Sequence, residues 1–210
     1  MTEIPIKRDG RKENANATQA ALQSAALRWF SEQGFEKAPV GSICADAGVT
    51  VGALYHHYGD KKGLFAAVVE QVDAQLVQAA MAASQGVTAK GGGAWDAFLA
   101  SIDTALHAGP HAPMRRLMLV DAPAVLGAQV WGDIRQRQGL GAMRGSIAAI
   151  QAHGIFQGHD AERLARIVLG ALYGGMDSLP DDEAGVQDAL ADTRQCLVAM
   201  LEGLRSKDVR

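Results

Sequence analysis

The sequence predicts an all-α fold in which a small N-terminal three-helix domain, of the helix-turn-helix kind, is fused to a larger helical domain. Hydrophobic residues make up 48% of the 210 residues but aromatic residues only 5%. Ala, Leu and Gly dominate and strand-forming runs are scarce, which favours helices. From Leu22 onward, apolar residues recur at the spacing of one helix face. Residues 40–57 place a turn glycine between two short apolar-patterned segments, which is typical of a helix-turn-helix.

We expect three parts along the chain: a flexible basic arm (1–17), a helix-turn-helix domain (18–65) and a larger domain (66–210). Residues 1–65 hold eight Lys and Arg against seven Asp and Glu, while the remainder holds twelve against sixteen. The net charge of −3 therefore does not exclude nucleic acid, because phosphate contacts depend on charge within about 8–10 Å. The basic residues of the arm either enter the minor groove of DNA or form a solvated tail. They are Lys7, Arg8, Arg11 and Lys12.

The first two helices of the N-terminal domain are predicted from the residues at their ends. Thr18 is a suitable N-cap for the first helix, and Gly34 is expected to end it. Pro39 occupies the place of a first helical residue and is expected to open a short second helix. The apolar face of the first helix consists of Leu22, Ala25, Ala26, Trp29 and Phe30.

The segment 40–57 has the residue types that a helix-turn-helix needs, at the required spacing. Cys44 is small enough for two helices to approach each other closely, and Gly48 can take the left-handed conformation of the turn. Thr50 is expected to cap a further helix, from Val51 to about His57. The apolar residues that lock the two helices together are Ile43, Ala47, Val49 and Leu54.

The rest of the chain is predicted to be a series of helices separated by glycine and proline. Asp60 is expected to cap a long helix from Lys61 to about Ser84, followed by a flexible connector at 89–93. Further helices are expected over residues 94–107, 113–121, 123–152, 160–178 and 182–205. Glycines within residues 123–152 weaken the prediction of one unbroken helix there, since each costs about 1 kcal/mol relative to Ala.

Residues 22–69 resemble the DNA-binding domain of TetR-family regulators. The resemblance rests on a helix ending in F-x-x-x-G-F, on A-G-V-T-x-G-x-L-Y and on K-x-x-L-F. The matching residues are Phe30, Gly34, Phe35, Ile43, Cys44, Ala47, Gly48, Val49, Thr50, Gly52, Leu54, Tyr55, His57, Tyr58, Lys61, Leu64 and Phe65. The resemblance implies an all-helical homodimer that binds a palindromic operator in double-stranded DNA. It also implies a repressor whose C-terminal domain binds a releasing small-molecule effector and dimerises through its last two helices.

Three positions depart from the family pattern. Ala38 stands where a phosphate-contacting Thr is usual, so that contact is not carried over, and Cys44 replaces a common Ala of compatible volume. Lys62 and Gly63 replace an acidic pair, which removes a capping-box Glu but adds a positive charge. We therefore expect that phosphate binding, more than helix stability, determines the residues at positions 62 and 63.

The first residues of the helix at 51–57 are expected to face base edges in the major groove of DNA. Because Gly52 and Ala53 are small, the backbone can approach the bases, and Val51 or Ala53 can touch a thymine methyl group. His57 and Tyr58 are expected to pack inside instead. The predicted DNA-binding residues, assigned partly by the resemblance, are Thr50, Val51, Gly52, Ala53, Tyr55, His56, Lys61 and Lys62.

The larger domain is expected to hold a ligand pocket near residues 121–134, whose sequence resembles a segment of one TetR subgroup. The candidate lining residues are large and apolar: Trp95, Phe98, Met114, Leu117, Met118, Trp131, Ile134 and Met143. For any single one of these residues, an ordinary helical core is the simpler explanation. Arg115, Arg116, Asp121 and Arg135 are candidate polar contacts or surface charges.

The last two predicted helices are expected to form a four-helix interface with a second copy of the chain. Their small residues permit close helix approach, and their apolar residues exceed what a lone surface helix needs. The predicted interface residues are Leu169, Leu172, Tyr173, Met176, Leu197, Met200, Leu201 and Leu204. The alternative is that they form the core of a monomer.

Several kinds of chemistry are not expected. His107 and His111 have a zinc-like spacing but a Gly-Pro pair separates them, and no HExxH, P-loop or GxSxG motif occurs. We therefore predict no metal, cofactor or catalytic residue. Cys44 and Cys196 are expected to be reduced and buried. A polar N-terminus and the lack of an 18-residue apolar run predict a cytoplasmic protein that does not span a membrane.

Two alternatives belong to other classes of protein. A helical small-molecule-binding protein without a role in DNA regulation would show no sequence-specific, salt-dependent DNA binding. A ligand-modifying enzyme would turn over a substrate although it has no recognisable catalytic motif.

Overall fold

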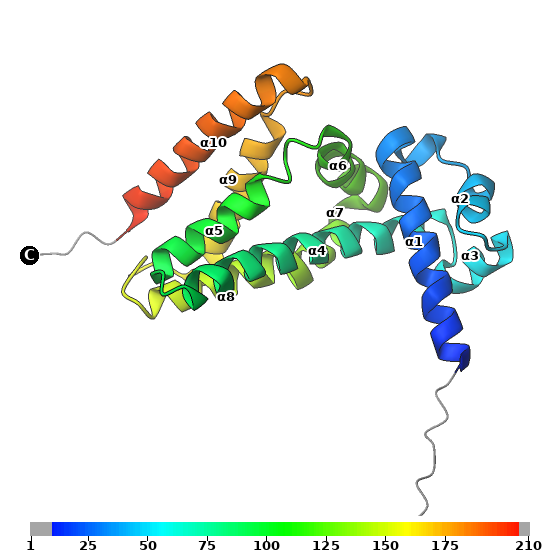
Figure 1. The fold of residues 1–210 in the computed structure, drawn as a ribbon, viewed down its shortest axis with the longest axis horizontal. Helices are drawn as coiled ribbons and strands as arrows, with labels where there is room; N and C mark the ends of the chain where they lie inside the picture. The colour runs from blue at the N-terminus through cyan, green and yellow to red at the C-terminus, as the bar shows by residue number, and fades with distance from the viewer. Residues whose placement is uncertain (1–9, 206–210) are drawn as a thin grey trace, which may run out of the picture. The chain divides into compact units, whose positions relative to one another are not determined.

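The computed structural model describes residues 10–205, and every regular element within that range is a helix (Figure 1). This confirms the predicted fold class. The chain divides into two compact units, Met1–Val68 and Val69–Arg210. The division falls within the first third of a long helix rather than at the expected residue 65.

The first unit is built from the predicted helices. They are α1 (Gly10–Lys37), α2 (Val40–Asp46), α3 (Val51–Tyr58) and the start of α4 (Lys61–Ala89). Gly34 interrupts α1 with a φ of 80°, as expected for a residue that ends a helical run. Pro39 is the N-cap of α2 rather than its first helical residue.

The prediction of a flexible arm is wrong for residues 10–17, because α1 begins at Gly10 rather than after Thr18. These residues lack apolar periodicity, but an exposed helical turn needs none. Glu13 lies in the first turn, where a negative charge stabilises a helix N-terminus. Lys7 and Arg8 lie outside the described residues.

An aromatic cluster forms the core of the first unit. Phe30 and Phe65 meet edge to face with 5.0 Å between ring centroids, and Phe35 lies 5.8 Å from Phe30 and 5.1 Å from Phe65. Leu22, Ile43, Leu54 and Leu64 are fully buried in the same unit. The predicted inner residues of α1, α2 and α3 therefore share one core.

The second unit continues α4 and adds the remaining helices. They are α5 (Ala94–Leu106), α6 (Ala112–Arg116), η1 (Leu117–Asp121), α7 (Ala122–Arg135), η2 (Gln136–Leu140), α8 (Gly141–Gln151), α9 (Ala161–Asp177) and α10 (Glu183–Leu204). The elements η1 and η2 are single π-helical turns, which occur frequently at functional sites.

The segment 123–152 is not one regular helix. Gly127, with a φ of 81°, interrupts α7, and the π-helical turn η2 separates α7 from α8. The longer helical run Ala112–Gln151 has the length and hydropathy of a membrane span, and 33% of its most apolar window is buried. The Gly127 kink and the π-helical turns interrupt this run, and residues along it such as Leu117, Ile134 and Ile147 are buried in the second unit.

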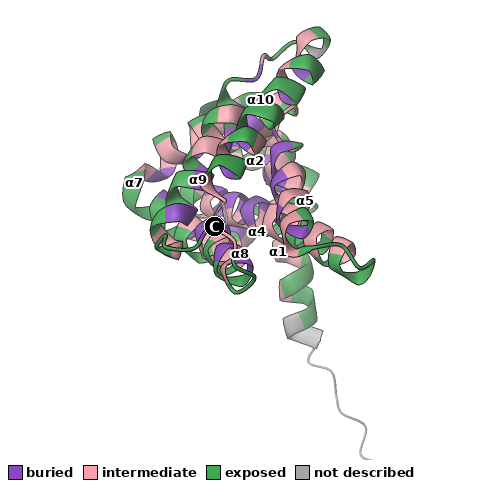
Figure 2. Cartoon of the chain, turned by 90° about the vertical axis from the view of Figure 1, so that its left-hand side faces the viewer, coloured by how far each residue is buried: buried purple, intermediate pink, exposed green. Residues whose placement is uncertain are grey.

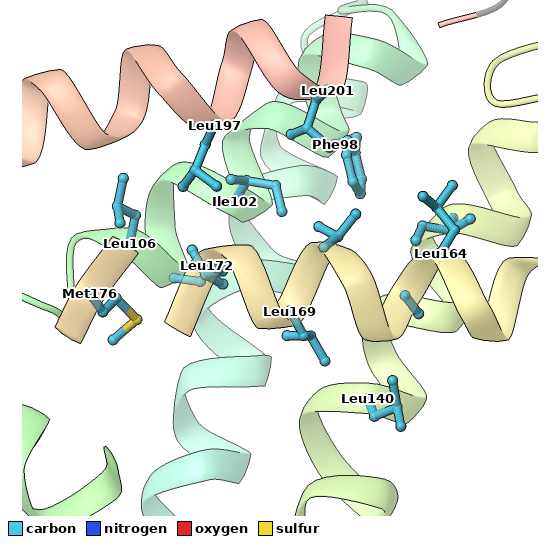
Figure 3. Packing of buried hydrophobic residues seen from close by; sticks show 14 of the residues in the cluster. Phe98, Ile102, Leu106, Leu140, Leu164, Leu169, Leu172, Met176, Leu197 and Leu201 are labelled. Carbon is cyan, nitrogen blue, oxygen red and sulfur yellow. The ribbon is translucent and has the colours of Figure 1, made fainter. Parts of the chain in front are cut away.

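The core of the second unit is a layer of leucines and aromatic rings between α5, α9 and α10 (Figure 3). Leu169 and Leu172 project from α9, while Leu197 and Leu201 of α10 point back toward Ile102 and its neighbours (Figure 3). The outer side of α10 is largely exposed (Figure 2). Helix α10 therefore buries one face and leaves the other to solvent.

Arg115 is a structural residue rather than a pocket contact. It is buried, and it donates hydrogen bonds to the Gly109 and Pro180 carbonyls and to the Asp181 carboxylate. These bonds link the loop after α5 to the loop after α9. Arg116 and Asp121 form an ion pair with each other, 3.3 Å between Nε and Oδ2.

The two cysteines lie in different environments. Cys44 is buried, as expected, and burial raises the pKa of its thiol. Cys196 is exposed on α10, so the prediction that it is buried is wrong. It occupies the outward position next to the buried Leu197.

We expect Phe98→Ala to lower the free energy of unfolding by about 3–5 kcal/mol, because it removes a buried ring from a close-packed core. The ring of Phe98 lies 6.0 Å from that of Trp95 and 5.9 Å from that of Phe156. Urea unfolding followed by circular dichroism measures the change. Val120→Ala, at an exposed position, is the control and should stay within about 0.5 kcal/mol of the unmodified protein.

Candidate nucleic-acid interface and ligand cavity

The turn between α2 and α3 has the geometry that the sequence predicts. Gly48 takes a φ of 67°, and the Val49 amide donates to the Cys44 carbonyl over 3.0 Å. The Thr50 side chain caps α3 by accepting a hydrogen bond from the Ala53 amide over 3.2 Å. The start of α3 is therefore fixed by its own sequence.

Helix α3 has one buried side and one exposed side. Leu54 is fully buried, whereas Val51 is 42% and Tyr55 52% exposed. Gly52 and His56 are also exposed, next to these residues. Val51 and Tyr55 leave two large side chains on the same exposed side of the helix. The structure thus places Val51, Gly52, Tyr55 and His56 on one open face of α3, whereas Ala53 is half-buried.

The two aromatic residues at the end of α3 are held by the unit itself. The hydroxyl of Tyr58 donates to the Gln19 carbonyl of α1 over 3.2 Å, and burial raises the pKa of that hydroxyl. His57 is half-buried, with its ring 5.2 Å from that of the exposed His56. Tyr58 and His57 are therefore positioned inward relative to Tyr55 and His56.

Lys61 and Lys62, at the start of α4, were both predicted to bind DNA, but the structure gives them different surroundings. Asp60 caps the helix, as predicted, by accepting from the Gly63 amide over 2.6 Å. Lys61 donates to the Glu36 carbonyl over 3.3 Å, and its ammonium lies 4.6 Å from the centre of the Phe35 ring. Lys61 is thus held against α1, while Lys62 is exposed.

Gly63 has a packing role that the sequence did not reveal. A Cβ atom at this position would lie 2.0 Å from the Tyr58 carbonyl oxygen, so no other residue fits without displacement. Close packing therefore accounts for the loss of the usual acidic residue here. The expectation that phosphate binding determines this position applies to Lys62 alone.

The second unit contains a cavity of about 350 Å³ between α4, α5, η2, α8 and α9. This volume lies within the usual range for small-molecule sites, about 300–1,000 Å³. The lining is mainly apolar and flexible, with three methionines: Met81, Met143 and Met176. Such a surface can adapt to an apolar ligand.

Of the predicted pocket residues, only Met143 lines this cavity. Phe98 and Trp95 pack instead with Phe156 in an aromatic cluster, and Phe98 borders a second hollow of about 300 Å³. The others belong to the helical packing of 112–135: Leu117, Trp131 and Ile134 are buried, and Met114 and Met118 are half-buried. The expectation that the cavity lies at residues 121–134 is therefore wrong.

One end of the cavity is polar. Asp73 of α4 is only 2% exposed, and its carboxylate accepts a long hydrogen bond, 3.4 Å, from the Gly139 amide of η2. Burial raises the pKa of this carboxyl, although the Gly139 amide and Arg135 oppose the shift. Burial and the nearby Asp73 charge raise the pKa of Tyr173 to about 12. The Arg135 guanidinium lies 4.4 Å from the centre of the Tyr173 ring.

Four of the predicted dimer residues face this cavity instead of a partner. Leu169, Leu172, Tyr173 and Met176 all line it. Apolar residues at this helical spacing on α9 could pack either inside the unit or against a second copy of the chain. The sequence alone did not distinguish these two arrangements. Their assignment to a dimer surface is corrected accordingly.

The predicted interface residues of α10 lie at the edge of an outer groove. Leu201 is buried and Leu204 half-buried against the core, while Leu197 and Met200 border a groove between α9 and α10. Small residues line the α9 side of this groove, namely Ala171 and Gly175. Ile167, 55% exposed, lies on the same helix.

Among residues 10–205, no group of three or more His, Cys, Asp or Glu side chains is placed to hold a metal ion.

The fold and the exposed face of α3 define a helix-turn-helix DNA-binding protein, and comparison with known proteins identifies its family. Residues 22–68 match the family described as bacterial regulatory proteins, tetR family, and residues 95–204 match the tetracyclin repressor-like C-terminal domain. The second match alone covers just over half of the chain. The chain therefore belongs to the TetR family of transcriptional regulators.

Individual relatives agree with this membership. A TetR-family transcriptional regulator from Pectobacterium atrosepticum is 32% identical and has a TM-score of 0.76, covering 93% of this chain and 97% of its own. The regulator FadR from Bacillus subtilis, solved in complex with stearoyl-CoA, shares the fold at 15% identity, with a TM-score of 0.65 over 88% of this chain and 98% of its own. The regulator AcrR of Shigella flexneri is 38% identical over 65 residues, which are 31% of this chain and 30% of AcrR.

We expect Tyr55→Ala to weaken DNA binding while leaving the free energy of unfolding within about 0.5 kcal/mol, because its side chain is exposed. Leu54→Ala, one residue away on the buried side, should instead lower the free energy of unfolding by about 2–5 kcal/mol. Urea unfolding and fluorescence anisotropy with DNA selected by the protein measure the two effects. An unchanged affinity in Tyr55→Ala would mean that this face of α3 does not bind DNA.

Proposed function

We propose that this protein is a cytoplasmic, dimeric repressor that binds a palindromic operator and is released from it by a small molecule. The observation that carries the proposal is the combination, in one TetR-family chain, of an open face on α3 and an apolar cavity in the second unit. The proposed DNA-binding residues remain Thr50, Val51, Gly52, Ala53, Tyr55, His56 and Lys62. Lys61 is now assigned mainly to holding α4 against α1.

Helix α4 supplies a route for coupling ligand to DNA. It is one continuous helix from Lys61 to Ala89, with Lys62 in its first turn and several cavity residues further along, including Asp73, Leu76 and Met81. We propose that a ligand which displaces α4 changes the position of the DNA-binding unit. A ligand acts in this way only if it binds the protein with different affinity before and after the DNA-binding unit has moved.

A dimer of this kind should select DNA with a defined symmetry. Two recognition helices bind half-sites about 10–10.5 base pairs apart, or a multiple of that distance. We expect selection from random double-stranded DNA to recover a palindrome with such a spacing. Recovery of no common sequence would contradict the DNA-binding part of the proposal, and would favour a helical ligand-binding protein.

Lys62→Ala should lower the slope of log affinity against log salt concentration by about 0.9, because it removes one phosphate contact. Lys90→Ala removes the same charge from an exposed position in the connector after α4 and serves as the matched control. Anisotropy titrations of the selected DNA at several salt concentrations measure both slopes. Equal slopes in the two variants would show that Lys62 does not contact phosphate.

The outer faces of α9 and α10 are the proposed dimer surface, because small residues there allow helices to approach closely. Light scattering should give a particle of twice the 22.1 kDa chain mass. We expect Ile167→Glu, a charge on that surface, to shift the protein toward the monomer. Val120→Glu, equally exposed on η1, should not. A monomeric unmodified protein would refute the dimer.

A further inference from the structure

The cavity in the second unit has a charge pattern that restricts its ligand. Among its described lining residues Asp73 is the only charged side chain, and no Lys, Arg or His lines it. An anionic ligand would therefore meet no positive group in the lining, and would be repelled by the one negative group. A positively charged ligand would be attracted by Asp73 and would meet no charge of its own sign in the lining.

Asp73 has unused capacity to accept hydrogen bonds. A carboxylate offers about four acceptor positions, and among the described residues Asp73 receives one hydrogen bond, over 3.4 Å, from the Gly139 amide. At 2% exposure the residue has little contact with bulk solvent. A buried carboxylate in this condition is costly unless it is paired.

The charged groups around Asp73 are already engaged with other partners. Glu70 pairs with Arg137, 2.9 Å between Nη2 and Oε1, and the Arg135 guanidinium lies over the rings of Tyr173 and Trp131. The opposing effect of Arg135 on Asp73 is smaller than that of burial, since the pKa of Asp73 remains raised. The carboxylate is therefore incompletely neutralised by the protein itself.

The absence of a side chain at residue 139 keeps the polar end of the cavity open. A Cβ atom on Gly139 would lie 3.3 Å from the Tyr173 hydroxyl oxygen and 3.6 Å from Oδ1 of Asp73. The amide of Gly139, the Tyr173 hydroxyl and the Asp73 carboxylate thus converge on one place. A hydrogen-bond donor placed there reaches the Asp73 carboxylate and the Tyr173 hydroxyl oxygen, while its apolar body lies among the methionines and leucines.

We propose that the ligand of this cavity is an apolar amine whose ammonium group binds the carboxylate of Asp73. An ammonium has three donors and a full positive charge, so it satisfies the acceptor positions and the charge together. The apolar body occupies the space beside Leu76, Met81 and Met143. This inference rests on the proposed function, since it names the class of effector for the same cavity.

Three probes of equal chain length separate charge from apolar contact: decylamine, decanol and decanoate. We expect calorimetry on the full-length protein without DNA, below the micelle concentration, to show decylamine binding at least ~10-fold tighter than decanol. Decanoate should bind weakest. Equal binding of the three probes, tightest binding of decanoate, or no binding of decylamine would overturn the inference.

Asp73→Asn keeps the shape of the side chain and removes its charge, so decylamine affinity should fall at least ~10-fold while decanol affinity stays within about twofold. Asp133→Asn makes the same charge change at an exposed position on α7 and should leave all three affinities unchanged. Unfolding curves confirm that Asp73→Asn is folded, as expected when a buried charge becomes neutral. If decylamine affinity is unchanged in Asp73→Asn, the inference is wrong. Because no DNA is present, failure of operator release does not affect this result.

Discussion

Burial of apolar residues along α4 is the constraint on which the rest of the structure depends. Leu64 and Phe65 at its start belong to the core of the first unit, and Val72 and Leu76 are packed within the second. Within the second unit, the packing of Leu76 against the core fixes which face of α4 turns inward. The same face carries Asp73, three residues earlier, into the cavity rather than to the surface, where an aspartate is normally found.

Much of the first unit was predictable because local rules determine it. Thr50 and Asp60 cap their helices and Gly48 forms the turn, all as the sequence indicates. The missed features depend on contacts between distant segments. The carbonyl of Glu36 engages Lys61, and the carbonyl of Tyr58 leaves no space beside Gly63. No spacing rule along the chain reveals such approaches.

The cavity lies in the unit where a ligand pocket was expected, but its lining differs from the residues that were expected to form it. Large apolar side chains were chosen as its lining, whereas Trp95, Phe98 and Trp131 fill space and pack against neighbouring side chains. A cavity forms where side chains are small, and its wall on α8 includes Ala142, Gly145 and Ala149. The apolar residues of α9 face it from the other side, so half of the predicted dimer surface proved to be internal. Apolar periodicity shows that a helix has a buried face but does not identify its partner.

The central claim is that occupancy of the cavity changes DNA affinity through α4. The most direct test is anisotropy of the selected operator at fixed protein concentration while decylamine is added to the level that saturates the cavity. Our account predicts that the protein leaves the DNA over the same concentration range in which the cavity fills. A saturated cavity with unchanged operator affinity would contradict it.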